Sequence, residues 1–143
     1  MFNPDIQSDM SLYNLVQTPD GLVGLNPKHL KGIFWNASYQ AMLAQKGITT
    51  NDRALVFIPA SIVVEGRIYT DPEHYLAMDE ASREGFWTLQ KGDIIINQLV
   101  MQTITKTSEL TQKYGKDNVF TVTNIAKNFF GQKVMHHFEV IAR

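Results

Sequence analysis

Apolar residues in this chain occur in short runs that turn-forming residues interrupt. The longest stretches, such as residues 54–60 and 94–96, fall far short of the roughly 20 residues that a membrane-spanning helix requires. Residues 119–125 alternate phenylalanine, valine and isoleucine with threonine and asparagine, the period-two pattern of a strand buried on one face. Residues 137–141 repeat that pattern. The sequence therefore predicts a mainly β fold built from short strands.

Two further segments indicate strands and a turn. Residues 54–59 form an apolar run closed by proline, which cannot donate to a sheet ladder, so we expect a central core strand that ends there. Residues 86–90 and 94–96 are β-rich runs separated by a glycine-containing turn, which predicts a hairpin. In this turn Gly92 tolerates a positive φ, and Asp93 can bond nearby backbone amides.

The C-terminal half contains a second expected hairpin and the one expected helix. The alternating segments 119–125 and 137–141 are joined by residues 128–132, whose glycine indicates a turn and therefore antiparallel pairing. Residues 103–114 fit one short helix that ends at Gly115. The aromatic residues expected to anchor the core are Trp35, Phe57, Trp87 and Phe138.

The chain divides into two parts of different character. Residues 1–30 hold one apolar segment, residues 12–16, within turn-rich surroundings. We interpret them as an N-terminal arm or as an edge strand plus a loop, either reaching onto a neighbouring subunit or packed on its own domain. Residues 31–143 form one barrel-like domain. Within it, residues 61–85 alternate β-prone pieces with turns and carry a solvated, charged tip at 79–85. The expected fold is a small antiparallel β-barrel or sandwich with one short α-helix and long decorated loops.

Composition excludes several classes of protein. The formal net charge of -1 provides no overall cationic field for DNA or an anionic membrane. Cysteine is absent, which excludes disulfides, thiolate zinc sites and cysteine nucleophiles. The first ten residues contain Asp5 and Asp9 and no basic segment followed by an apolar run, so we expect no signal peptide.

Motifs that carry catalysis or cofactors are missing from the sequence. It has no Gly-x-Ser-x-Gly elbow, no P-loop, no glycine-rich dinucleotide turn and no His-Glu-x-x-His helix. Adjacent His136 and His137 would point to opposite faces of a strand, so they cannot easily hold one ion together with His29 or His74. We therefore expect a protein that is not an enzyme, with no catalytic, cofactor-binding or metal-binding residues and no cofactor.

Other polar and aromatic residues allow two interpretations. The carboxylate pairs Asp71 with Glu73 and Asp79 with Glu80 lie in turn-like sequence, where a solvated loop is more usual than a catalytic pair. Trp35 and Trp87 fit core positions better than a stacking platform. Four lysines could contact DNA phosphates in a multi-subunit ring, although a solvated face balanced by Glu109 and Asp117 fits an isolated chain better: Lys106, Lys113, Lys116 and Lys127.

Five segments, in this order and spacing, resemble a family of small proteins from tailed phages and prophages. They are residues 32–35 (Gly-Ile-Phe-Trp), 52–59 (ending Ile-Pro), 87–95 (Trp-Thr-Leu-Gln-Lys-Gly-Asp-Ile-Ile), 119–123 (Val-Phe-Thr-Val-Thr) and 135–140 (Met-His-His-Phe-Glu-Val). The resemblance covers roughly residues 32 to 143. The sequence departs from the family pattern at residues 125–130, where members usually have polar, arginine-containing turns, and in its longer N-terminal arm.

The resemblance implies a virion structural role. Members are similar to head-closure, or stopper, proteins, which form a ring between the portal and adaptor above and the tail below. We therefore expect a head-tail connector subunit of the virion neck, assembled in the host cytoplasm, that forms a homo-oligomeric ring, a hexamer or dodecamer, and helps to retain packaged DNA. Its partners would be adaptor or portal-side proteins and tail-terminator or tail-tube proteins, with only non-specific DNA contact in the channel and no membrane. The alternatives are an adaptor, a tail-completion protein, or a small-barrel module that binds nucleic acid or a peptide.

Overall fold

The computed structural model describes residues 7–18, 21–23, 27–36, 44–47 and 54–143. Strands dominate it, and the helices are short. In chain order its principal elements are β1 (Gln7–Tyr13), β2 (Val16–Thr18), β3 (Gly21–Val23), β4 (Lys28–Asn36), β5 (Ala54–Pro59), β6 (Ile68–Tyr69), α2 (Pro72–Ala77), α3 (Glu80–Arg83), β7 (Phe86–Trp87), β8 (Ile94–Ile96), α4 (Thr107–Tyr114), β9 (Phe120–Asn128), the 3-10 helix η2 (Lys133–Met135) and β10 (His137–Ala142).

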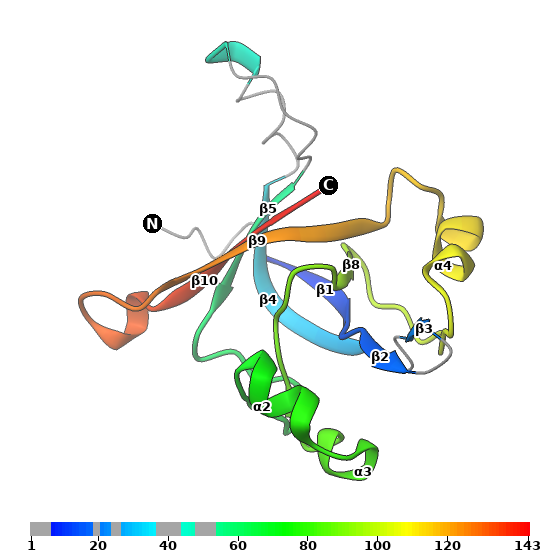
Figure 1. Cartoon of the computed structure of the whole chain (residues 1–143). Helices are drawn as coiled ribbons and strands as arrows, with labels where there is room; N and C mark the ends of the chain where they lie inside the picture. The colour runs from blue at the N-terminus through cyan, green and yellow to red at the C-terminus, as the bar shows by residue number, and fades with distance from the viewer. Residues whose placement is uncertain (1–6, 19–20, 24–26, 37–43, 48–53) are drawn as a thin grey trace.

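Six strands close into a barrel in the order β1-β4-β5-β10-β9-β8, and β8 pairs again with β1 (Figure 1). Each neighbouring pair is antiparallel. Two small sheets lie outside the barrel, the β2-β3 ribbon and the parallel β6-β7 pair. This confirms the expected mainly β fold and selects the barrel over the sandwich.

Alternation of side chains along the strands builds the core, as the period-two pattern predicts. On β10, Phe138, Val140 and Ala142 are buried, and the register sets Phe138 opposite Ile58 and Val140 opposite Val56 of β5. Because β9 pairs antiparallel with β10, the predicted C-terminal hairpin is confirmed. The main buried cluster consists of Met10, Leu12, Leu30, Ile33, Val56, Ile58, Val64, Trp87, Leu89, Ile95, Val122, Phe138, Val140 and Ala142.

Helix α4 covers a second, smaller core. It spans Thr107–Tyr114 within the predicted range and ends at Gly115, whose φ of 89° favours glycine. Its buried residue Leu110 packs in a cluster with Tyr13 of β1 and Val119, which directly precedes β9. The prediction of a helix in this region is confirmed, although its first turn starts later than residue 103.

The N-terminal region differs from the predicted arm. β1 lies between β4 and β8 in the barrel, and its residues Met10, Leu12 and Tyr13 are fully buried. The polar Ser11 between them is buried too, because its hydroxyl donates to the Gln98 carbonyl and accepts from the Val100 amide. Residues 7–13 are therefore a barrel strand, and the boundary at residue 30 falls inside β4.

The predicted hairpin of residues 86–96 is wrong. β7 pairs in parallel with β6, while β8 pairs with β1 and β9, so the two runs belong to different sheets. The intervening turn still has the expected chemistry. Gly92 has a φ of 93°, and the Asp93 carboxylate accepts a hydrogen bond from the Gln90 amide at 3.1 Å.

The expected core aromatics divide into two groups. Trp87 and Phe138 are buried, and Trp35 packs against the core while partly exposed. Phe57 points to the outer face of β5 and contacts the His137 ring edge-on at 5.4 Å between centroids. β5 lies between β4 and β10 as expected of a central strand, but only alternate residues are buried.

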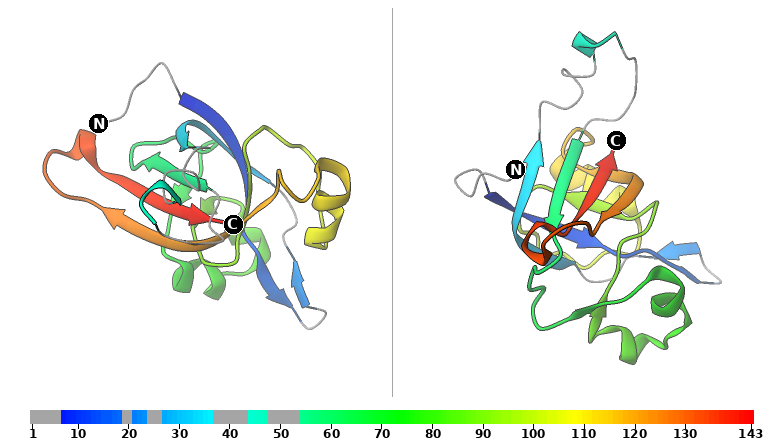
Figure 2. Two further views of the ribbon diagram at one scale, coloured as in Figure 1. Left: turned by 90° about the horizontal axis from the view of Figure 1, so that it is seen from above. Right: turned by 90° about the vertical axis from the view of Figure 1, so that its left-hand side faces the viewer.

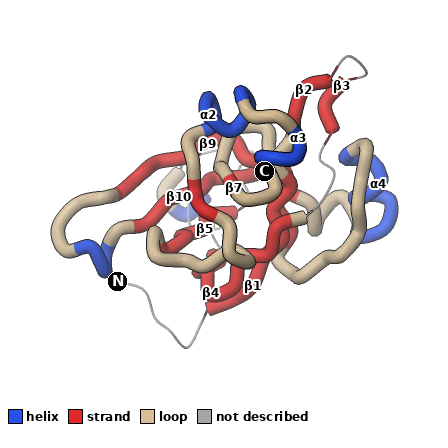
Figure 3. Tube along the Cα trace, turned by 90° about the horizontal axis from the view of Figure 1, so that it is seen from below, coloured by secondary structure: helices blue, strands red, loops and turns tan. Residues whose placement is uncertain are grey.

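Residues 61–85, here called the 61–85 excursion, leave the barrel between β5 and the turn before β8. They contain α2 and α3, which the sequence did not predict because each helix has less than two turns, too few for a periodic pattern. The two helices lie at one end of the barrel (Figures 1 and 3). The predicted charged tip is indeed largely exposed over residues 79–85.

No helix in the described segments has the length and apolar character to cross a bilayer.

Candidate functional site

A buried polar network lies where β1 ends. Asn14 follows β1, and its amide nitrogen donates to the Asp93 carboxylate at 2.7 Å and to the Thr88 carbonyl at 2.7 Å. Its amide oxygen accepts from the Lys28 amine at 2.8 Å and from the Thr88 backbone amide at 3.3 Å. Asn14 therefore connects an acidic and a basic side chain that come from different strands or turns.

Asp93 is the acidic member and is fully buried. Besides Asn14, it accepts from the backbone amides of Leu15 at 3.0 Å and Gln90 at 3.1 Å. Burial raises the pKa of its carboxyl to about 7, although these hydrogen bonds act in the opposite direction.

Lys28 is the basic member and is 6% exposed. Its amine donates to the Tyr75 hydroxyl of α2 at 2.8 Å and lies 4.9 Å from the centroid of that ring. Burial lowers the pKa of the Lys28 amine to about 8, and the charge of Arg67 lowers it further while Asp93 raises it. Lys28 and Tyr75 thereby attach the 61–85 excursion to the barrel.

The network acts by joining segments. Asn14, Lys28, Tyr75 and Asp93 are all buried, so their polar atoms are directed at one another instead of at solvent. General acid or base catalysis requires that the group reach the proton of a substrate within hydrogen-bond distance. The geometry thus fits a structural junction of the N-terminal strands, α2 and the turn before β8.

The outer surface carries a different feature, a set of exposed apolar side chains. Among the described residues, the large apolar side chains that are exposed fall in three segments of the chain, all outside the barrel strands. They are Val63, Ile68 and Leu76 in the 61–85 excursion, Leu99 and Met101 between β8 and α4, and Phe129, Phe130, Val134 and Met135 between β9 and β10.

The last group forms the end of a projecting hairpin. Residues 129–136, here called the hairpin tip, join β9 to β10 and extend away from the barrel on the side opposite α4 (Figures 1 and 2). The Phe129 ring stacks on His136 with centroids 5.4 Å apart and meets the buried Phe138 edge-on at 5.3 Å. These contacts attach the tip to the core, while Phe130 and Val134 stay 77% and 76% exposed.

The histidines considered from the sequence lie in separate places. His29 bonds the Val100 carbonyl, His74 pairs with Thr70, and His136 stacks on Phe129. His137 lies beside Glu139 at 3.3 Å. The described part of the chain brings together no group of three or more histidine, aspartate and glutamate side chains that could hold a metal ion.

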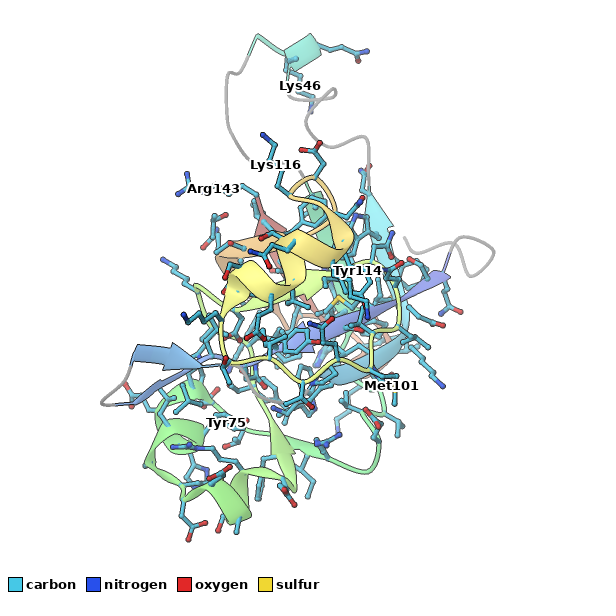
Figure 4. The ribbon with its side chains drawn as sticks, turned by 90° about the vertical axis from the view of Figure 1, so that its right-hand side faces the viewer. Lys46, Tyr75, Met101, Tyr114, Lys116 and Arg143 are labelled. Atoms are coloured by element: carbon cyan, nitrogen blue, oxygen red, sulfur yellow. The ribbon has the colours of Figure 1, made fainter. Side chains whose placement is uncertain are left out.

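The other polar residues considered from the sequence also lie apart. Lys127 forms an ion pair with Asp71 at 2.5 Å on the flank of β9, away from the lysines around α4. The hydrogen bond from Lys127 lowers the pKa of the Asp71 carboxyl. At α4, the Lys113 amine lies 5.5 Å from the Tyr114 ring, and Lys116 follows just beyond the helix (Figure 4). Asp79 accepts from the Ser82 amide as the N-cap of α3.

Sequence reasoning identified one member of the buried network and missed the others. Asp93 was singled out as a turn residue, and the three apolar residues that follow it were a signal that its carboxyl is buried. Asn14 is the polar residue within the apolar segment 12–16, which is a signal of burial, whereas Lys28 and Tyr75 stand in polar or turn-rich sequence that gives no such sign. Only the three-dimensional pairing brings them together.

The barrel, its buried junction and its loops define a class: a small, closed antiparallel β-barrel protein with loops that expose apolar side chains. Within that class the chain belongs to the family described as "Family of unknown function (DUF6751)", whose model matches residues 6–143. The match begins before β1, in agreement with the position of this strand in the barrel. Comparison with curated proteins and with solved structures found no match.

Proposed function

We propose that this protein is a non-enzymatic structural subunit of a tailed phage, a head-closure connector that forms a ring in the virion neck. The observation that carries the proposal is the concentration of exposed apolar side chains on segments outside a closed barrel. Burial of apolar surface is favourable by roughly 25 cal/mol per Å², so exposed segments of this kind favour contact with other subunits.

The five segments that resemble phage connector proteins fall largely on the frame of the barrel. They map to β4, β5, the β7-to-β8 region, β9 and β10. The exposed apolar residues fall mostly between those segments. A closed barrel with exposed apolar loops fits a protein whose role is to connect different neighbours. This supports placement between an adaptor or portal-side protein and the tail, with assembly in the host cytoplasm.

The network around Asn14 supports the structural role in another way. It uses a buried acid and a buried base to attach α2 to the barrel, and it directs neither group at the surface. An adaptor or a tail-completion protein would use the same features. These features therefore support a structural role, and the head-closure position rests on the resemblance.

Native mass spectrometry of the purified protein and electron microscopy of phage particles test the proposal together. We expect a closed ring of identical subunits, a hexamer or dodecamer, and density for the protein in the neck. Phage that lack the gene should produce heads that lose packaged DNA. A protein that stays monomeric at high concentration and binds nucleic acid or a peptide would instead be a small-barrel binding module.

A further inference from the structure

We propose that the hairpin tip of one copy docks on the 61–85 excursion of a second copy of this chain. The inference rests on the proposed function, because it names the surfaces through which the ring would form. Of the three exposed apolar segments described above, this contact uses the hairpin tip and the 61–85 excursion.

The hairpin tip has the properties of a segment that inserts into a neighbouring subunit. β9 and β10 hold it by antiparallel pairing from His137 opposite Asn128 onward, and Phe129 anchors it against Phe138. Phe130 and Val134 are the most exposed apolar residues of the tip. The tip therefore presents a fixed apolar surface that its own barrel does not cover.

Charge distinguishes the two segments that could receive this tip. Residues 129–136 contain Lys133 and no carboxylate. The loop that bears Leu99 and Met101 has no charged residue over positions 97–103, so it offers the lysine no attraction.

The 61–85 excursion is acidic as well as apolar. It has six carboxylates and two arginines, a formal net charge of -4, or -3 if Lys127 neutralises Asp71. Val63 and Ile68 of this excursion are 75% and 64% exposed. Complementary charge around apolar contacts favours the correct partner and register, so the excursion is the receiving surface.

Within one chain, the excursion already contacts the base of the hairpin. The Ala60 amide donates to the His136 carbonyl at 2.9 Å, and the Tyr69 ring lies 4.9 Å from the Phe138 ring. These contacts occupy the base and flank of the hairpin and leave Phe130 and Val134 exposed. Because the tip and the excursion are different surfaces, each copy would give one and receive the other, an arrangement that closes into a ring when the rotation allows it.

Engineered cysteines test the contact directly, since the natural chain has none. Val134→Cys in a tagged chain and Ile68→Cys in an untagged chain are purified, mixed and oxidised. A disulfide between chains of different size joins two copies, and a stable contact between the two cysteines raises its yield above that of random collision. Met101 is more exposed than Ile68, at 79% against 64%, so a Met101→Cys chain in place of the Ile68→Cys chain provides the control for accessibility.

We expect a cross-linked heterodimer for Val134→Cys with Ile68→Cys, at least several-fold more abundant than for Val134→Cys with Met101→Cys. Predominant cross-linking to Met101→Cys would overturn the choice of the excursion. Predominant disulfides between two Val134→Cys chains would show a symmetric tip-to-tip contact and would overturn the proposal as well.

A second experiment separates failure of this inference from failure of the proposed function. Phe130→Ser with Val134→Ser should abolish the oligomers seen by native mass spectrometry while leaving the circular dichroism spectrum that of a folded chain, whereas Leu99→Ser with Met101→Ser should preserve the oligomers. Oligomers that survive the tip variant would overturn this docking while the connector proposal stands. A wild-type chain without oligomers would overturn both.

Discussion

At the scale of single residues, Asn14 provides the hydrogen bonds that connect the buried acidic and basic side chains. A side-chain amide both donates and accepts, so it can bond an amine with its oxygen and a carboxylate with its nitrogen. Asn14 does both, with Lys28 and Asp93. Asn14 also donates to the Thr88 carbonyl, and a hydroxyl, which has one hydrogen to donate, could not bond both this carbonyl and Asp93.

Replacement of Asn14 by alanine should therefore be costly. Asn14→Ala leaves the buried Lys28 amine and Asp93 carboxyl each short of a partner, and we expect the free energy of unfolding to fall by about 3 kcal/mol. Urea denaturation followed by tryptophan fluorescence measures this loss. Asn124→Ala, at an exposed position of β9, is the control and should change stability by less than about 0.5 kcal/mol. Similar stabilities for the two variants would contradict the assigned role of Asn14.

The titration of Asp93 should appear in the pH dependence of stability. Folding raises the pKa of this carboxyl from its ordinary 3.8 to about 7, so between these values the folded chain holds a proton that the unfolded chain has lost. The free energy of unfolding should consequently fall as pH rises through that window, by at most about 1.4 kcal/mol per pH unit for one proton. Asp93→Asn should remove this slope. Denaturation series at several pH values compare the two proteins, and equal slopes from pH 4 to 7 would refute the assignment.

Lys28 should contribute the opposite slope at higher pH. Its pKa falls from 10.5 to about 8 on folding, so between these values the unfolded chain holds a proton that the folded chain has lost. The contribution of Lys28 to the free energy of unfolding should rise with pH in this window. Lys28→Met should flatten the rise between pH 8 and 10.5, measured by the same denaturation series. Lys31→Met, at an exposed position of β4, is the control and should keep the wild-type slope.

At the scale of elements, the sequence predicted best those elements whose signals are local. α4 was found from its apolar positions and the glycine at its end, and the β9-β10 pair from its period-two alternation. The hairpin expected at residues 86–96 failed because a glycine turn between β-rich runs looks the same whether the runs pair or enter different sheets. The partner of β7 is β6, and nothing in the sequence of residues 86–87 specifies a parallel neighbour.

Helix α4 offers a test of the smaller core. Leu110 is fully buried in the cluster with Tyr13 and Val119, so Leu110→Ala should cost about 2–5 kcal/mol by loss of packing. Gln112→Ala lies on the exposed face of the same helix and should have little effect. Thermal unfolding by circular dichroism compares the variants. If they melted alike, α4 would not be part of the cooperative unit.

At the scale of the whole molecule, the barrel depends on its first strand. β1 contributes Met10 and Leu12 to the main core and pairs on both sides, with β4 and with β8. The sequence suggested an arm or an edge strand because the alternation in residues 9–12 is short and lies within turn-rich sequence. The Ser11 hydroxyl can be buried because it forms hydrogen bonds with the backbone of residues 98 and 100. These partners are distant in the sequence, so the sequence around Ser11 does not indicate them.

Deletion of residues 1–13 should consequently abolish cooperative folding. Loss of β1 opens the barrel between β4 and β8 and exposes part of the main core. We expect no cooperative thermal transition by circular dichroism or tryptophan fluorescence, whereas Gln7→Ala, at an exposed position of β1, should retain the full-length transition. A truncated chain that melted cooperatively would restore the description of this region as an arm.

Closure of the six-stranded barrel also bears on the behaviour of the protein at high concentration. An open sheet offers unpaired backbone groups on which identical chains can stack into fibres. In this barrel every strand has a neighbour on both sides. Strand addition is therefore restricted to the parts of the strands that their neighbours do not cover, since β8 pairs with β9 at two positions and with β1 at three. Detachment of β1 would open the barrel between β4 and β8, so resistance to aggregation and the integrity of the fold both depend on this strand.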